Sequence, residues 1–206
     1  MRNVIGICTV SAFCIFLLVV TDCGEKAASD TELAAASRHV VNSFMEELKT
    51  ELYAALEDSG VIEAVKICSE KAPEISARYS SLPGWTVKRV SARYRNPNNG
   101  PDEFEKESLE ILENRPATAG DEYFTWIEEN GEKSFRFMKV IQMKARCLKC
   151  HGDKSKFSDD LLKIVEEEYP DDQATGFKLD EQRGAFSVTV KWPEGKAVFD
   201  SVTASM

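Results

Sequence analysis

The residues most able to do chemistry stand together in the hexapeptide Cys147-Leu148-Lys149-Cys150-His151-Gly152. Two cysteines separated by two residues and followed at once by a histidine form the attachment signature of c-type haem. This spacing lets two thiols bond to the two vinyl groups of one porphyrin, and the adjacent imidazole then falls beneath the iron. We therefore predict one covalent haem c, held by Cys147 and Cys150, with His151 as the proximal iron ligand.

Two other chemistries use closely spaced cysteines. A thioredoxin-like redox pair would sit in a strand–helix–strand unit and would not require the histidine. A zinc knot would need a second pair of cysteine and histidine ligands, which the sequence does not provide. Both interpretations are weaker than haem attachment.

Composition limits the class of protein. The chain has 206 residues, of which 43% are hydrophobic and 30% charged, which is typical of one globular domain with appendages. Its net charge of -9 argues against nucleic-acid binding, because that function needs a positive surface to neutralise phosphates. We find no phosphate-binding glycine loop and no paired catalytic carboxylates.

The N-terminal residues have the layout of an export signal. Arg2 precedes an apolar run from Val4 to Val20, and polar residues follow. The run is also nearly long enough to span a bilayer. We predict a signal peptide or membrane anchor over residues 1–22, a polar tether over 23–30, and a periplasmic or extracytoplasmic, membrane-anchored protein.

Lipidation is one way in which the chain could be anchored. Val20-Thr21-Asp22-Cys23 resembles a bacterial lipobox, in which Cys23 would be the lipidated first residue of the mature protein. Asp22 departs from that pattern, because a small residue is usual there. A lipoprotein, an uncleaved anchor and ordinary cleaved export therefore all stay open.

Export makes one cysteine conspicuous. Once the cysteines of the signal region and of the haem motif are assigned, Cys68 has no disulfide partner in an oxidising compartment. It lies on the apolar face of a predicted helix, at helical intervals from Val65 and Ala72. It is either a buried structural cysteine, which is common, or an iron ligand.

The elements that must position these residues follow from hydrophobic periodicity and turn signals. Helices are predicted over Thr31–Asp58 with Asp30 as N-cap, over Val61–Lys71 and across Pro73 to Tyr79, from Pro101 to about Asn114, and over Asp159–Glu168 with Ser158 as cap. Strands are predicted over Trp85–Tyr94, Tyr123–Glu128, Ser134–Met143 and Arg183–Trp192, with a hairpin at Asn130-Gly131. Helices first and then an antiparallel sheet with helical insertions indicate an α+β domain over residues 31–195 and a tail over 196–206.

Three arginines cluster near the end of the first predicted strand. Arg89, Arg93 and Arg95 could pair with haem propionates, because a guanidinium group matches a carboxylate. A solvated strand face is an equally good explanation of these residues.

Several stretches together resemble a known family: Ile67 to Pro73, Arg89 to Pro101, the haem motif, and Ala174 to Phe177 with Arg183-Gly184-Ala185. They are similar to the exported c-type haem domains first catalogued as a domain of unknown function. The resemblance spans roughly 48–190 and implies a PAS-like fold with His/Cys ligation of haem. Such domains occur alone and as sensor modules ahead of signalling domains. Two positions depart from the family pattern: Asp180, where glycine is usual, and Phe104, where tryptophan is common.

The sixth iron position has several candidates. With His151 assigned as the proximal ligand, the remaining candidates are His39, Cys68, or one of the methionines Met45, Met138 and Met143. The position could also be open. The strand that leads into the motif carries Met138 and Met143, so the distal side favours Cys68. The resemblance implies the same residue.

These ligands suggest two functions. A labile Cys68 ligand would suit a redox or gas sensor, whereas a thiolate-ligated haem could also serve a low-potential electron-transfer cytochrome. Either would need an unidentified redox or signalling protein partner. We expect no enzymatic activity, because a cysteine-filled distal site leaves no room for a peroxidase substrate.

Overall fold

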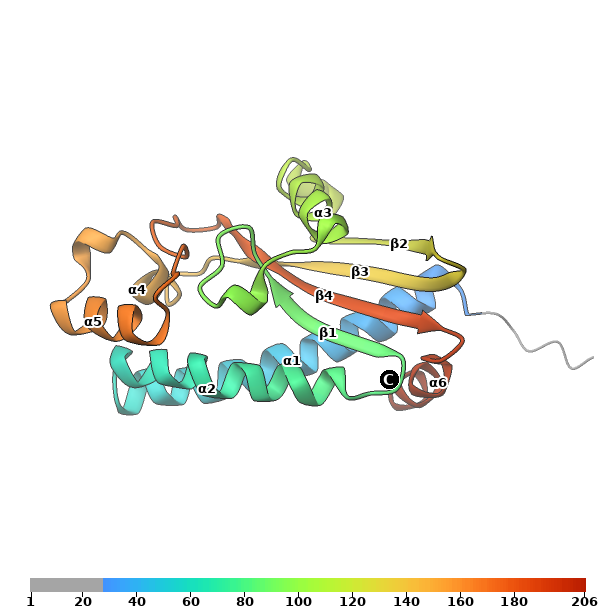
Figure 1. The fold of residues 1–206 in the computed structure, drawn as a ribbon, viewed down its shortest axis with the longest axis horizontal. Coiled ribbons are helices and arrows are strands. Elements are labelled where there is room, and N and C mark those ends of the chain that lie inside the picture. Colours follow the sequence, from blue (N-terminus) through green and yellow to red (C-terminus); the bar gives the residue numbers. More distant parts are fainter. Residues whose placement is uncertain (1–27) are drawn as a thin grey trace, which may run out of the picture.

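A four-stranded antiparallel sheet forms the centre of the fold (Figure 1). The computed structural model describes residues 28–206. The neighbouring strands follow the order β1-β4-β3-β2. Their bounds are Trp85–Val90 for β1, Glu122–Glu129 for β2, Glu132–Gln142 for β3 and Gln182–Trp192 for β4. The predicted α+β class, with N-terminal helices and helical insertions around an antiparallel sheet, is confirmed.

The turn between β2 and β3 is the predicted Asn-Gly hairpin. Asn130 and Gly131 have φ values of 53° and 80°, the left-handed conformation that asparagine tolerates and glycine favours. This turn fixes the register in which Glu129 faces Glu132.

Two long helices cover one face of the sheet. They are α1 (Asp30–Asp58) and α2 (Val61–Ser80), and α2 contains Pro73. Apolar residues of α1, including Phe44, meet sheet residues such as Phe137 and Val188 in the main core. The N-cap of α1 is Ser29 rather than the predicted Asp30, because the Ser29 hydroxyl and the Glu32 carboxylate form a reciprocal capping box.

The opposite face carries α3 (Glu103–Glu113), which begins at the capping residue Asp102. Leu109 and Leu112 of this helix pack on Met138 and neighbouring sheet residues. The buried carboxylate of Glu105, with no exposed side-chain surface, pairs with Lys88 at 2.9 Å. The two faces of the sheet therefore hold separate clusters of buried residues.

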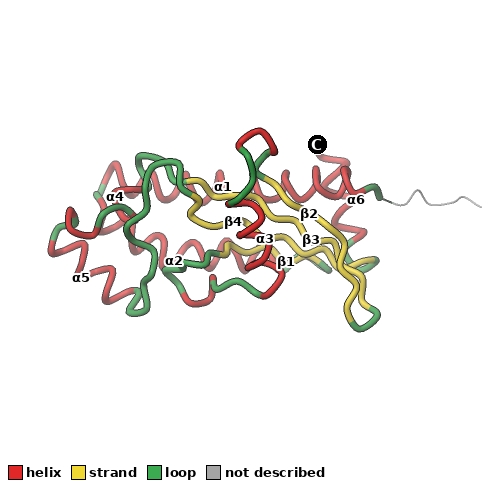
Figure 2. The backbone as a smooth tube through the Cα atoms, turned by 90° about the horizontal axis from the view of Figure 1, so that it is seen from above, coloured by secondary structure: helices red, strands yellow, loops and turns green. Residues whose placement is uncertain are grey.

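The haem motif lies at one end of the molecule, beyond the sheet (Figures 1 and 2). It contains the short helix α4 (Leu148–His151), and α5 (Asp159–Glu168) lies next to it and packs on α2. The Ser158 cap and the bounds of α5 are as predicted, since Ser158 Oγ accepts from Leu161 N. Three short 3-10 turns complete the connections: Pro97–Asn99, Ala117–Ala119 and Lys154–Lys156.

One further expectation about secondary structure was wrong, and one helix was not predicted. Strand β1 ends at Val90 rather than Tyr94. The reason is that the Ser91 amide donates to the carbonyl of Asn99, and the Ser91 hydroxyl donates to the carbonyl of Arg183. The predicted tail is largely a helix, α6 (Lys196–Ser205), which buries Phe199 in the main core. Because β1 ends at Val90, the chain around Arg93 and Arg95 forms a loop.

The predicted signal or anchor, residues 1–22, and the proposed lipidation site Cys23 lie outside the described residues. Among the helices of residues 28–206, none is both long enough and apolar enough to cross a membrane.

Candidate haem site

Cys68 and His151, which are 83 positions apart in the sequence, line the same cavity. Cys68 comes from the middle of α2, and His151 is the last residue of α4. The cavity has a volume of about 270 Å³ and is also bordered by Arg89, Arg95 and Arg183. We call it the Cys68–His151 cavity.

The haem motif is held in a compact turn. The amides of Cys150 and His151 both donate to the carbonyl of Cys147, and the amide of Gly152 donates to that of Leu148 at 3.0 Å. A Cβ atom at Gly152 would lie 2.5 Å from the Leu148 carbonyl oxygen, so this position requires glycine. The thiols of Cys147 and Cys150 are free and partly buried.

The orientation of the His151 ring is fixed by the backbone. Its Nδ1 atom lies 2.7 Å from the carbonyl oxygen of Ala174. A carbonyl oxygen can only accept, so Nδ1 carries the hydrogen and Nε2 keeps its lone pair for a metal. Burial, together with Arg183 and Arg95, holds the pKa of His151 well below its usual value, which keeps the ring neutral. This is the state in which histidine binds iron.

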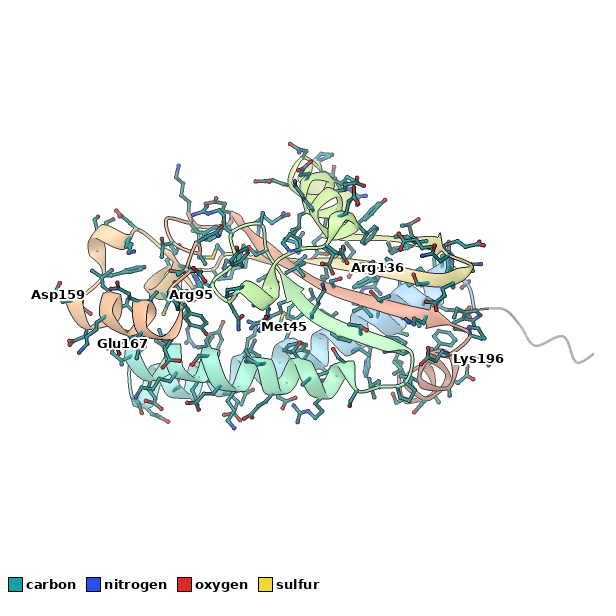
Figure 3. All side chains as sticks on the ribbon, viewed as in Figure 1. Met45, Arg95, Arg136, Asp159, Glu167 and Lys196 are labelled. Atoms are coloured by element: carbon teal, nitrogen blue, oxygen red, sulfur yellow. The ribbon has the colours of Figure 1, made fainter. Side chains whose placement is uncertain are left out.

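The segment that supplies the Ala174 carbonyl is itself anchored. Asp172 Oδ1 accepts from Ala174 N at 2.9 Å and from Arg95 Nε at 3.0 Å. The side chains of Arg95 and Asp172 are only 8% and 7% exposed, so this is a buried ion pair. Arg95 also donates to the Cys150 carbonyl at 2.7 Å, and Figure 3 shows it near α5. Arg95 therefore ties the loop after β1 to the haem motif.

Of the arginines predicted to meet propionates, Arg89 and Arg95 border the cavity and Arg93 is not among its lining residues. The Arg93 guanidinium donates to the Thr175 carbonyl and lies 3.8 Å from the centre of the Phe177 ring. Phe177 meets the His151 ring edge to face at 6.5 Å between centroids. Arg93 thus supports the segment behind His151.

Arg183 is a site residue that the sequence reasoning missed. It borders the cavity and donates to Ser91 Oγ at 2.8 Å and to the Arg93 carbonyl at 3.0 Å. Burial, followed by the charges of Arg95 and Arg89, lowers its pKa to about 10. Arg183 belongs to one of the stretches that resemble the haem family, which was a signal of a role in the site. Its position in a predicted strand did not show whether its side chain would face the cavity.

The charge around the cavity is strongly positive. Within residues 28–206, the Arg89 side chain has no hydrogen-bond or ion-pair partner, and burial lowers the pKa of its guanidinium. Burial raises the pKa of the Cys68 thiol, although Arg89, Arg95 and Arg183 oppose the shift. Asp172 compensates Arg95, so Arg89 and Arg183 remain available to an anion.

The other candidates for the sixth iron position do not line the Cys68–His151 cavity. His39 is exposed on α1 in a surface depression that it shares with Asn42 and Glu46. Met45 packs against the main core and lies away from Arg95 in Figure 3. Met138 is fully buried in the cluster on the α3 face of the sheet. Met143 is fully buried next to the haem motif, in a cluster against which Cys147 packs.

The surroundings of the cysteine pair match neither a thioredoxin-like redox pair nor a zinc site. The motif lies between β3 and β4, which pair antiparallel, so it does not sit in the parallel strand–helix–strand unit of a thioredoxin-like protein. In the described part of the chain, no group of three or more histidine, cysteine or acidic side chains is placed to hold a bare metal ion.

The donor set fits haem. Cys147 and Cys150 would hold it covalently, His151 would offer Nε2 to the iron, and Cys68 stands across the same cavity. Arg89 and Arg183 supply uncompensated positive charge for carboxylates.

The two departures from the family pattern are accommodated. Asp180 adopts φ 62°, a conformation that glycine favours and aspartate tolerates, and its amide donates to the Met143 carbonyl. Phe104 stacks on Tyr123 beneath the guanidinium of Arg136, on the α3 face of the sheet.

Comparison with known proteins identifies the family of this chain. The crystal structure of the cyanobacterial haem protein Tll0287 matches with a TM-score of 0.56 and 25% identity, over 81% of this chain and 99% of its own. A comparison with curated proteins finds no match. The family model described as Tll0287-like covers residues 19–191, most of the chain. The chain therefore belongs to the Tll0287-like family of haem proteins.

Proposed function

We propose that this protein is an exported, membrane-tethered monohaem c-type haem protein that acts as a redox or gas sensor. In this proposal Cys147 and Cys150 attach the haem covalently, His151 is the proximal ligand and Cys68 is a labile distal ligand. The observation that carries it is the shared cavity of Cys68 and His151, which combines a thiol, a neutral imidazole and uncompensated arginines.

Haem supplies an iron that cycles between the ferric and ferrous states and binds small gases where a coordination position is open. The protein's part would be to hold the two iron ligands, His151 and Cys68. Because a thiolate favours the ferric state, reduction would weaken the bond between Cys68 and the iron.

Release of Cys68 from the iron would affect elements outside the cavity. Cys68 stands on α2, which contacts α1, β1 and α5. Five positions later Pro73 lacks the amide hydrogen that would continue the helical ladder, so α2 is weakened close to the ligand. A ligand-dependent shift of α2 is therefore the proposed signal, and it would be read by an unidentified protein partner.

An electron-transfer role is the second candidate. The cavity reaches the surface beside the exposed Asn98, and a haem whose edge is near solvent can exchange electrons directly. A carrier would keep Cys68 bound in both oxidation states, whereas a sensor would release it in one.

A potential-controlled optical and EPR titration of the haem-loaded protein tests both roles. The sensor predicts a low-spin ferric form and a reduced form that binds carbon monoxide or nitric oxide readily. Cys68→Ala should turn the ferric spectrum high-spin or reveal a new ligand, whereas the neighbouring Ser69→Ala should leave it unchanged. An unaltered spectrum in Cys68→Ala removes Cys68 from the iron, and failure of the reduced wild type to bind either gas favours the carrier.

Covalent attachment has its own test. In protein made with a c-type haem maturation system, haem should stay with the denatured chain. The double variant Cys147→Ala, Cys150→Ala should lose all of it, and retention would contradict attachment at these cysteines.

A further inference from the structure

A second, larger concavity lies along the outer side of the haem motif. This α4 groove has a volume of about 810 Å³ and runs between α4, the turn at Lys154–Lys156 and the segment 176–178. Its apolar lining includes Leu148, Phe157 and Phe177. Three lysines stand around that lining: Lys149, Lys156 and Lys178.

These lysines outnumber the acidic residues of the lining. Within residues 28–206, none of the three forms an ion pair, whereas lysines elsewhere, such as Lys139 and Lys144, do. Asp153 is the acidic residue of the lining. Its carboxylate accepts from the amide and hydroxyl of Ser155, and it also feels the charge of Lys156, so the charge of the other two lysines stays in excess. The groove is therefore a positive patch on a chain whose net charge is -9.

The α4 groove and the haem residues share one helix and are linked by a hydrogen bond. Helix α4 contributes Leu148 and Lys149 to the groove and His151 to the Cys68–His151 cavity. The amide of Phe177 donates to the His151 carbonyl at 3.0 Å. A partner bound in the groove would thus lie one helix away from the iron site.

The position of the groove points to a protein rather than to the membrane. Helix α1 begins at the opposite end of the molecule from α4 (Figure 1). An anchor attached ahead of α1 would place α4 on the far side from the lipid surface. Apolar side chains with lysines around them also match the usual anatomy of a protein interface, in which an apolar centre is surrounded by a polar rim.

We propose that the α4 groove is the docking surface for an acidic redox protein that exchanges one electron with the haem iron. Carboxylates of the partner would meet Lys149, Lys156 and Lys178, and an apolar side chain would cover Leu148 and Phe157. The electron that the iron gains is lost by the partner's one-electron cofactor, or the reverse. The transfer makes no covalent bond between the two proteins, and any release of Cys68 would follow it. This proposal rests on the proposed function, because a redox sensor and an electron carrier both exchange electrons with a partner.

The first test maps anion binding without any reaction. Hexacyanochromate(III) is a redox-inert trianion that broadens NMR signals near its binding site. With the haem-loaded protein it should broaden amides of residues 148–157 and 176–178 selectively. Broadening centred elsewhere would overturn the positive character of the groove, whatever the haem ligands are.

The second test measures electron exchange with hexacyanoferrate(III), an anionic acceptor. If the groove governs the encounter, the oxidation rate of the reduced protein should fall as salt rises, because opposite charges are being screened. If the net charge of -9 governs it, the rate should rise with salt. The sign of the salt dependence decides between the two.

Charge-reversal variants give the matched control. The triple variant Lys149→Glu, Lys156→Glu, Lys178→Glu should slow the reaction about tenfold at low salt. The triple variant Lys49→Glu, Lys106→Glu, Lys133→Glu changes the net charge equally and should slow it less than about twofold. Equal slowing would overturn the docking surface, and an unchanged optical spectrum in both variants shows that the haem site itself is intact.

A protein probe tests the class of partner. Carbodiimide cross-linking joins a lysine to a carboxylate in direct contact, and an acidic [2Fe–2S] ferredoxin supplies the carboxylates. Cross-links should concentrate at Lys149, Lys156 and Lys178. Cross-links spread equally over the control lysines would overturn the proposal, as would groove-dependent binding to phosphatidylglycerol vesicles with no cross-link to the ferredoxin.

Discussion

The ring of His151 donates its Nδ1 hydrogen to the carbonyl of Ala174 over 2.7 Å. Ala174 is in turn held by Asp172, whose carboxylate also pairs with Arg95. The orientation of the proposed proximal ligand therefore depends on a buried ion pair outside the haem motif.

Asp172→Ala should lower the free energy of unfolding of the haem-loaded protein by about 3 kcal/mol, because it leaves the buried Arg95 without a counter-charge. The ferric spectrum should also change, since the Ala174 carbonyl loses its support. Guanidinium denaturation followed by circular dichroism measures the first effect. The exposed neighbour substitution Asp171→Ala should stay within about 0.5 kcal/mol of wild type, and equal effects at the two positions would contradict this role.

Arg89→Gln should lower the reduction potential of the haem. A positive charge beside the cavity disfavours the ferric state, so its removal should lower the potential by on the order of 50 mV, equivalent to about 1 kcal/mol of Coulomb energy. Spectroelectrochemistry measures the change. The exposed Arg78→Gln, on α2, is the control, and an unchanged or raised potential in Arg89→Gln would argue against Arg89 as a neighbour of the haem.

Glu122 should make stability depend on pH. Burial raises the pKa of this carboxyl, but hydrogen bonds from Arg38 at 2.7 Å and Lys139 at 3.0 Å outweigh burial and hold the pKa below its ordinary value of 4.5. A lowered pKa contributes stability that is present above the ordinary value and is lost as the pH falls through the folded-state pKa.

At pH 7, Glu122→Gln should therefore cost about 1–2 kcal/mol, a modest figure because Arg38 is partly exposed and screened by solvent. The gap between wild type and variant should narrow as the pH falls below 4.5. Urea unfolding across this pH range measures it. Glu128→Gln, exposed on the same strand, should show no such convergence, and a gap that widens with acid would be the wrong sign.

Phe199→Ala should destabilise the fold without touching the haem. Phe199 lies in the main core and meets Trp192 edge to face at 6.0 Å between ring centroids. The loss should be about 3 kcal/mol, as for other buried aromatic truncations. Thermal unfolding measures it, with the exposed Ser201→Ala as control. A changed haem spectrum would contradict the separation of α6 from the haem end (Figure 1).

Local signals predicted most of the elements. Ser158 fixes the start of α5, and the Asn130-Gly131 pair fixes the hairpin, because caps and turns depend on a few adjacent residues. Strand β1 was predicted too long and helix α6 was not predicted, for the opposite reason. The end of β1 depends on contacts of Ser91 with Asn99 and Arg183, and α6 is stabilised by burial of Phe199 against distant residues.

The sequence by itself determined that Cys147, Cys150 and His151 have the spacing of a c-type haem motif, because that spacing is a property of adjacent residues. Only the tertiary structure decided what surrounds them. It placed Cys68 and Arg183 beside His151, turned Arg93 away to Thr175, and gathered three lysines along the outer side of α4. Lys149 and Lys156 are close to the motif in the sequence. Cys68, Arg183 and Lys178 instead come from α2, β4 and the segment after Gly176, and their proximity follows from how the helices and sheet pack rather than from any local pattern.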